Sequence, residues 1–185
     1  MRKNIVKVSA IVAMSTLMVG CMGGGVKLSP EAQAKINSST KYNPASVVVT
    51  LKSVDATKEV KYPSASELST LLKADIQKYL KNNNLACISK ANCLDLDVNL
   101  DYKRVFLVKS NSVGVPEFSQ RIDIKDGSKV FYSNSLNGQT LETGFTRNMS
   151  IISKVGSSDT NVDDEKSDVD RIAKLIVKDV ASLTK

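Results

Sequence analysis

The residues that offer the most chemistry in this chain are its three cysteines, because the sequence contains no histidine. Cys87 and Cys93 are separated by only five residues. Neighbouring cysteines in an oxidising compartment most often pair, and so short a loop would stabilise the fold by about 2 to 3 kcal/mol or less. We therefore expect a structural disulfide. Reduced thiols, a metal site or a redox pair are the alternatives, although redox pairs more often have a two-residue spacing.

A second chemical pattern lies in a polar stretch over residues 156–168, which we expect to be a loop. Hard cations bind clustered oxygens, and calcium loops supply them from alternate positions. The matching residues, from the first to the twelfth loop position, are Asp159, Asn161, Asp163, Glu165, Ser167 and Asp170. However, Asp164 stands where a glycine should make the sharp turn, and Asp170 replaces the long bidentate glutamate. We expect an acidic surface loop without metal, and calcium binding is the alternative.

The composition bears on catalysis and on nucleic-acid binding. Without histidine there is no Ser-His-Asp catalysis, and Gly23–Gly25 follows no strand and so is not a phosphate-binding loop. A hydrolase that uses only carboxylates is the remaining enzymatic alternative. The net charge is +7, but the basic residues are scattered and aromatic residues make up only 5%, which argues against nucleic-acid binding. We expect a protein that is not an enzyme and uses no cofactor.

The elements that must position these residues follow from hydrophobic periodicity. Val47–Leu51 is a β-branched run typical of a strand, and Glu59–Tyr62 is either a short strand or an extended approach to a proline. Ser64 and Glu67 match a capping box, which predicts a helix that the asparagines at 82–84 end. Its apolar stripe, which we expect to pack on a core, consists of Leu68, Leu71, Leu72, Ile76, Tyr79 and Leu80.

The clearest predicted strand covers residues 94–102, where apolar residues alternate with acids. Period two places Leu94, Leu96, Val98, Leu100 and Tyr102 on one face of a sheet. The opposite face then carries Asp95, Asp97, Asn99 and Asp101. We expect a solvated face, and a cation site or an acid–base pair is the alternative. A change of phase after Tyr102 indicates a bulge near Lys103 and Arg104.

Two dipeptides, Asp126-Gly127 and Asn137-Gly138, predict hairpin turns between further strands. Ser167 can cap a last helix, whose inward stripe is Val169, Ile172, Ile176, Val180 and Leu183. The expected fold class is therefore α+β. We predict an antiparallel sheet of about four strands with two helices packed on one face, in the order strand, helix, strands, helix.

The N-terminus has the features of a secretory signal. Arg2, Lys3 and Lys7 place positive charge at the start, and an apolar or small segment follows as far as Val19. This segment is too short and too weakly apolar for a permanent membrane span, which needs roughly 20 apolar residues. An ordinary cleaved signal with an incidental cysteine after it is one interpretation of this pattern.

The run Leu17-Met18-Val19-Gly20-Cys21 resembles the lipobox of bacterial lipoprotein signal peptides, with Met18 where that family prefers leucine. The resemblance implies that Cys21 carries diacylglycerol on its sulfur and a third acyl chain, such as palmitate, on its amino group. Several acyl chains anchor a protein far more firmly than one. In that family an Asp after the cysteine retains the protein in the inner membrane. Met22 stands here instead, which implies the outer membrane.

This resemblance divides the chain into three parts. Residues 1–20 are the expected signal peptide and 21–46 a lipidated flexible tether with one short helix over Glu31–Ile36. Residues 47–185 form a single α+β domain that faces the periplasm. The membrane is thus an expected partner through the N-terminal lipid, and nucleic acid is not.

The predicted element order resembles that of several small envelope lipoproteins. Among them are lipopolysaccharide-assembly lipoproteins, auxiliary lipoproteins of lipid-transport systems and curli-secretion-type lipoproteins. The likeness is one of topology, and no functional residue carries over beyond Cys21. It implies a non-enzymatic assembly or structural partner of another envelope protein. The alternative is a periplasmic binding module for a small molecule, a lipid or an envelope polymer.

Overall fold

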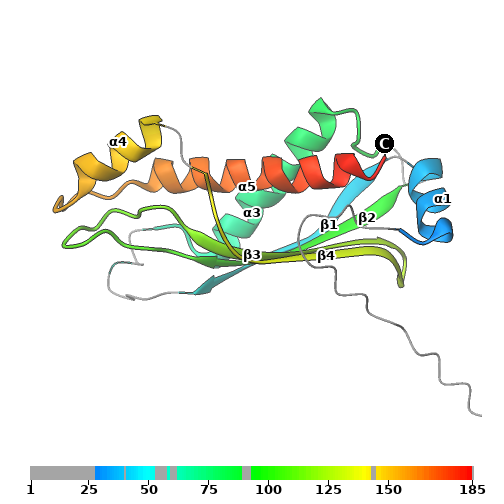
Figure 1. The fold of residues 1–185 in the computed structure, drawn as a ribbon, viewed down its shortest axis with the longest axis horizontal. Helices are drawn as coiled ribbons and strands as arrows, with labels where there is room; N and C mark the ends of the chain where they lie inside the picture. The colour runs from blue at the N-terminus through cyan, green and yellow to red at the C-terminus, as the bar shows by residue number, and fades with distance from the viewer. Residues whose placement is uncertain are drawn as a thin grey trace, which may run out of the picture.

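The computed structural model describes residues 28–39, 41–52, 58, 62–88, 93–142 and 145–184. Within these residues the chain forms four strands and four helices (Figure 1). In chain order they are α1 (Pro30–Ser39), β1 (Tyr42–Lys52), α3 (Ala65–Asn82), β2 (Leu94–Lys103), β3 (Glu117–Asp126), β4 (Lys129–Thr140), α4 (Phe145–Lys154) and α5 (Val162–Ser182). The expected α+β class is confirmed, and α4 is a helix that the sequence did not predict.

The four strands form one mixed sheet in the order β1-β2-β3-β4. The β2–β3 and β3–β4 pairs are antiparallel, whereas β1 and β2 run parallel. The prediction of a purely antiparallel sheet is therefore wrong. The reason is α3, because a helix of this length between two neighbouring strands returns the chain to the end at which the first strand began.

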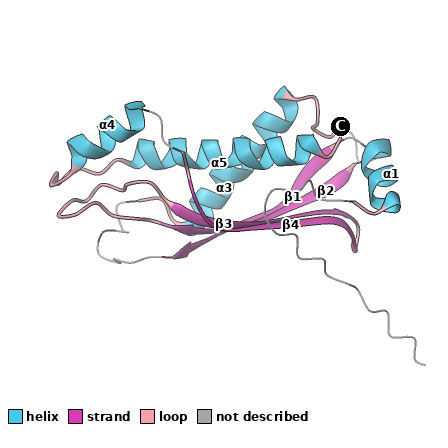
Figure 2. Ribbon diagram, in the orientation of Figure 1, coloured by secondary structure: helices cyan, strands magenta, loops and turns pink. Residues whose placement is uncertain are grey.

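Helices α3 and α5 lie on the same face of the sheet, as expected (Figure 2). Between them and the sheet is one apolar core, to which α3 contributes its predicted stripe and α5 its own. The alternation of β2 is also as predicted, since its apolar residues are buried and its acids point to the other face. No helix among the described residues is long and apolar enough to cross a membrane.

The two long helices differ in how well their starts were predicted. The capping box of α3 is confirmed, because Ser64 Oγ accepts from Glu67 N (3.3 Å) and Ser64 N donates to Glu67 Oε2 (2.7 Å). Helix α5 begins at Val162, so the expected loop over 156–168 and the cap at Ser167 are wrong. The three acids of its first turn are stabilised by the positive end of the helix dipole. The polar stretch over residues 162–168 therefore forms two turns of helix instead of a loop.

Strands β3 and β4 form the hairpin expected at Asp126-Gly127, and Gly127 adopts φ +58° in the turn. The second expected turn, at Asn137-Gly138, is wrong because β4 continues through it to Thr140. The register with β3 shifts there, so the dipeptide forms a bulge in which Gly138 takes φ +59°. Gly138 N donates to Ser119 Oγ across the pair (3.0 Å).

The folded part begins earlier than the expected boundary at Val47. Helix α1 covers the short helix predicted in the tether, and Ile36 is fully buried in the core. Strand β1 starts at Tyr42, which is also fully buried. Residues up to Lys27, with the predicted signal peptide and Cys21, lie outside the described residues, as does most of Glu59–Tyr62.

Candidate functional site

Cys87 and Cys93 form a disulfide with their Cα atoms 5.9 Å apart, as the spacing predicted. The bridge joins the segment after α3 to the start of β2. The same segment is tied to β1, because Cys87 N donates to Tyr42 O (3.2 Å). The disulfide thus holds together the N-terminal ends of the two parallel strands.

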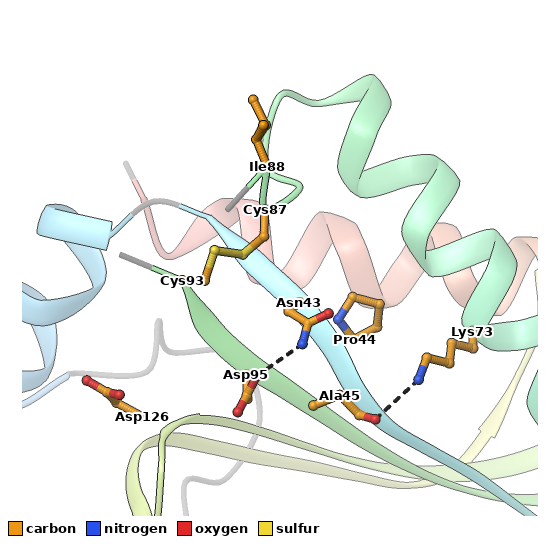
Figure 3. Close-up of a pocket in the computed structure, with 9 residues that line it drawn as sticks. All are labelled: Asn43, Pro44, Ala45, Lys73, Cys87, Ile88, Cys93, Asp95 and Asp126. Atoms are coloured by element: carbon orange, nitrogen blue, oxygen red, sulfur yellow. Dashed lines mark hydrogen bonds between the residues drawn. A yellow bond between two sulfur atoms is a disulfide. The ribbon is translucent and has the colours of Figure 1, made fainter. Parts of the chain in front are cut away.

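A surface groove of about 670 Å³ lies beside this disulfide (Figure 3). Asn43 Nδ2 donates to Asp95 Oδ1 (3.2 Å) and Lys73 Nζ donates to Ala45 O (3.2 Å). Ile88 is 98% exposed at its rim. The lining residues come from β1, α3, the disulfide loop, β2 and β3, and they are Asn43, Pro44, Ala45, Lys73, Cys87, Ile88, Cys93, Asp95 and Asp126.

The lining side chains of this groove suit binding rather than covalent chemistry. Asp126 is paired with Lys35 (2.6 Å), and Lys73 is engaged with a backbone carbonyl. The two cysteines are bonded to each other. The groove therefore offers carboxylate and amide groups for polar contacts, and its lining holds no nucleophile beside a base.

The six residues of the calcium-like pattern do not converge on one point. From Asp163 onward they lie on α5, where a helix cannot wrap them around a cation. Glu165 is bound to Arg104, and Asp170 accepts from Lys78 Nζ (2.6 Å) and Tyr79 Oη (2.7 Å). The described residues contain no cluster of three or more His, Cys, Asp or Glu side chains able to hold a metal ion.

Asn161 has a structural role that the pattern did not reveal. It precedes α5, yet its side chain makes no capping hydrogen bond. Instead Val113 N and Tyr62 Oη donate to its Oδ1 (2.7 and 2.9 Å), and its Nδ2 donates to Val113 O (2.7 Å). Burial raises the pKa of Tyr62, so the phenol stays neutral and can donate. Asn161 thus ties the loop after β2 to the start of α5.

A buried ion pair that the sequence analysis missed lies close by. Arg104 and Glu165 are 1% and 0% exposed. Arg104 Nε and Nη2 donate to the two Glu165 oxygens at 2.5 and 3.0 Å, and Nη2 also binds Pro63 O. The bulge expected near Lys103 and Arg104 is instead the end of β2. The change of phase in the sequence marked the point at which an arginine turns inward.

A second arginine attaches α4 to the domain. Arg147 Nη1 donates to Asp164 (2.7 Å), and its Nη2 donates to Asp168 (2.8 Å) and to Gly114 O (3.0 Å). Burial raises the pKa of Asp168, and Arg147 opposes that shift by favouring the ionised carboxylate. Ser150 adds a hydrogen bond to Asp164 (2.9 Å). The inward side of α4 is therefore held by polar contacts.

The outward side of α4 is apolar. Met149 and Ile152 are 50% and 67% exposed, and Val155, just after the helix, is 58% exposed. The helix was not predicted, although Met149 and Ile152 have the three-residue spacing of one helix face. A surface helix usually turns such apolar residues toward the protein.

The acids of β2 form ion pairs and hydrogen bonds on the face of the sheet opposite α3 and α5. Asp97 pairs with Lys125 of β3, and Asp101 lies 2.7 Å from Lys52 of β1. Asp95 accepts from Asn43 in the groove. Because these acids already have partners, they favour the expected solvated face of the sheet over a cation site.

No protein-family model, curated protein or solved structure matches this chain.

Proposed function

We propose that this chain is a lipid-anchored bacterial cell-envelope protein and a non-enzymatic assembly or structural partner of another envelope component. The lipobox-like run ending at Cys21 supports a lipid anchor, and Met22 after it supports the periplasmic side of the outer membrane. The Cys87–Cys93 disulfide suits the same oxidising compartment.

The observation that carries the assembly role is the apolar outward side of α4. Exposed apolar patches that are surrounded by polar residues mark sites of contact with proteins or membranes. Here Arg147 of α4 donates to Asp164 and Asp168 of α5, so the opposite side of the helix, with the patch, faces away from the domain.

The filled core argues against a lipid carrier. A carrier needs an apolar hollow between sheet and helices. In this protein that space is occupied by fully buried side chains, among them Ile76 of α3, Ile176 of α5 and Ile122 of β3. Among the described residues the apolar interior therefore stabilises the fold and leaves no space for a lipid between the sheet and the helices.

The groove beside the disulfide favours a second candidate, a binding module for a polar envelope ligand. Its volume is in the range of small-molecule sites, which is about 300 to 1,000 Å³. The two candidates depend on different residues. If the chain is a binding module, Asp95→Ala should weaken ligand binding in the groove. If it is an assembly partner, a charge at Ile152 should weaken its contact with the other envelope protein.

The anchor is tested by three variants expressed at native level in a host with two membranes. Cys21→Ala should leave the membrane fraction and lose metabolic acyl label, because the thiol is the attachment point. Met22→Asp should move the chain to the inner membrane, and Met22→Ala should change neither property. A Cys21→Ala chain that stays membrane-bound and labelled would show that the anchor is wrongly assigned.

The assembly role is tested by chemical crosslinking of intact cells followed by mass spectrometry. The wild-type chain should give adducts with a defined envelope protein, and Cys21→Ala should give fewer because it has left the membrane. Failure to recover any envelope partner at native abundance would contradict the role. Acyl label retained in the same cells would still support the anchor.

A further inference from the structure

Helix α4 has an outward side that the packing of the domain does not explain. A surface helix ordinarily turns its apolar residues toward the protein. In α4 the half-buried positions include Arg147 and Ser150, which bind carboxylates of α5, together with Ile151. Met149 and Ile152 face solvent instead. The favourable free energy of removing them from water is therefore gained only when a partner binds.

The exposed side chains form a ridge. Met149 and Ile152 are three residues apart and therefore neighbours on one side of the helix, and the exposed Val155 follows in the turn after it. Val108, 74% exposed, extends the ridge, because its turn is fixed to the end of α4 by Ser110 Oγ, which donates to Lys154 O (2.8 Å). Apolar anchors at this spacing are what a hydrophobic groove accepts from a helix.

The polar groups around the ridge favour a protein over a lipid surface. Asn148 and Ser153 beside it are uncharged, and the Lys154 ammonium lies 3.8 Å from the Asp159 carboxylate. Lys109 adds one exposed cation next to Val108. Helices that bind anionic membranes carry several Lys and Arg on their polar side. A rim of neutral groups and paired charges is instead typical of protein interfaces.

The position of α4 in the domain indicates the direction from which the partner comes. Helix α5 runs between α4 at one end of the molecule and α1 at the other (Figure 1). Gln33 of α1 donates to Leu183 O at the end of α5 (3.3 Å). The 21 residues of α5 span about 31 Å. Cys21 precedes α1 in the sequence, so if it carries lipid, as the proposed function holds, α4 lies at the opposite end of α5 from the described helix that follows the attachment point most closely in the sequence.

We propose that a second envelope protein docks on the ridge of Met149, Ile152, Val155 and Val108. The ridge inserts into an apolar, uncharged groove on that partner. This inference rests on the proposed function for the direction of approach. A second copy would present the same protruding ridge, and the groove that its described residues form beside the disulfide is lined by polar groups such as Asn43 and Asp95. A different protein can approach the ridge directly.

The test places a photoreactive phenylalanine derivative at Ile152 of the full-length lipidated chain in its native host. The matched control position is Leu175 of α5, an apolar side chain that is 46% exposed and lies outside the ridge. Irradiation should give one discrete adduct with another protein at 152 and none at 175. Met149→Lys in the same chain should abolish that adduct. The partner, once identified and purified, should bind Ile152→Lys about tenfold more weakly than wild type, with Leu175→Lys unchanged.

Each other outcome overturns the proposal. An adduct containing only this chain would assign the ridge to a second copy, and adducts with lipid alone would assign it to a membrane. Equal adducts at 152 and 175, or no adduct at either, would mean that the ridge is not a docking site. Acyl labelling of the same cells separates these results from failure of the proposed function, because loss of label refutes the anchor whatever the ridge binds. Unchanged thermal unfolding of Ile152→Lys checks that the variant folds.

Discussion

At the scale of single residues, the most consequential groups are charges buried at the start of α5. Arg104 and Glu165 are almost wholly removed from water, and their attraction offsets the cost of desolvation only because both side chains are fully engaged. Arg147 with Asp168 repeats the arrangement closer to the surface. These residues looked like parts of a loop or a cation site in the sequence, and they are the polar framework of one end of the molecule.

Replacing Arg104 with Met should lower the free energy of unfolding by about 3 to 5 kcal/mol, because Glu165 would remain buried without a counter-charge. The double variant Arg104→Met with Glu165→Leu should recover most of that loss. Urea unfolding of the three proteins measures both effects. A single variant that loses less than about 1 kcal/mol would mean that Glu165 finds water or another partner.

At the scale of elements, both edge strands carry features that interrupt regular pairing with another strand. On β1, Pro44 lacks an N–H, and Val49 N donates to Ser69 Oγ of α3 (2.9 Å). On β4 the register shifts twice, once near Phe131 and once at Asn137-Gly138. Such irregular edges discourage association of sheets between molecules. We therefore place the docking surface on α4 and not on a strand edge.

The bulge at Gly138 gives a graded prediction. At φ +59° an alanine is strained by about 1 to 2 kcal/mol, and asparagine less, because its side chain tolerates this conformation. Apart from the two neighbouring residues of the chain, no described residue has an atom within 4 Å of where a Cβ would stand, so the conformation and not crowding sets the cost. Thermal unfolding should rank the variants Gly, Asn, Ala, Val from most to least stable. An alanine variant as stable as wild type would show that the bulge rearranges freely.

At the scale of the whole molecule, α5 is joined by carboxylates to α4, α3 and β4. Its start holds α4 through Asp164 and Asp168, and its middle binds α3 through Asp170. Near its end Asp179 accepts from Tyr132 Oη of β4 (3.2 Å). These ties are made by carboxylates, so the stability of the molecule should depend on their ionisation.

The acid dependence can be predicted for Asp170. Burial favours its neutral form, but hydrogen bonds from Lys78 and Tyr79 outweigh it and lower the pKa below the ordinary value of 3.8. A lowered carboxyl pKa stabilises the fold above the unfolded pKa, and the contribution disappears as the pH falls through the folded value. Asp170→Asn should therefore cost about 1 kcal/mol at neutral pH, since the pair is partly exposed, and almost nothing near pH 2. Urea unfolding at both pH values measures this, and a pH-independent cost would contradict it.

How far the sequence reaches depends on whether a signal is local. The stripe of α3, its capping box, the alternation of β2 and the Asp126-Gly127 hairpin were predicted because each depends on residues a few positions apart. The Asn137-Gly138 turn failed because the same dipeptide serves a turn or a bulge. Only pairing with Ser119 on the neighbouring strand decides between them.

By itself the sequence determined the α+β class, the faces of its elements and the nearness of Cys87 to Cys93, since periodicity and spacing act along the chain. The tertiary structure decided that β1 and β2 run parallel and that residues 162–168 are helical. It also decided that Met149 and Ile152 of α4 face solvent. For the start of α5 and for α4 the physical reason is pairing between residues far apart in the sequence. The buried partner of Glu165 is 61 residues away and Arg147 bonds to acids 17 and 21 residues away, so their pairing depends on how the chain folds back on itself.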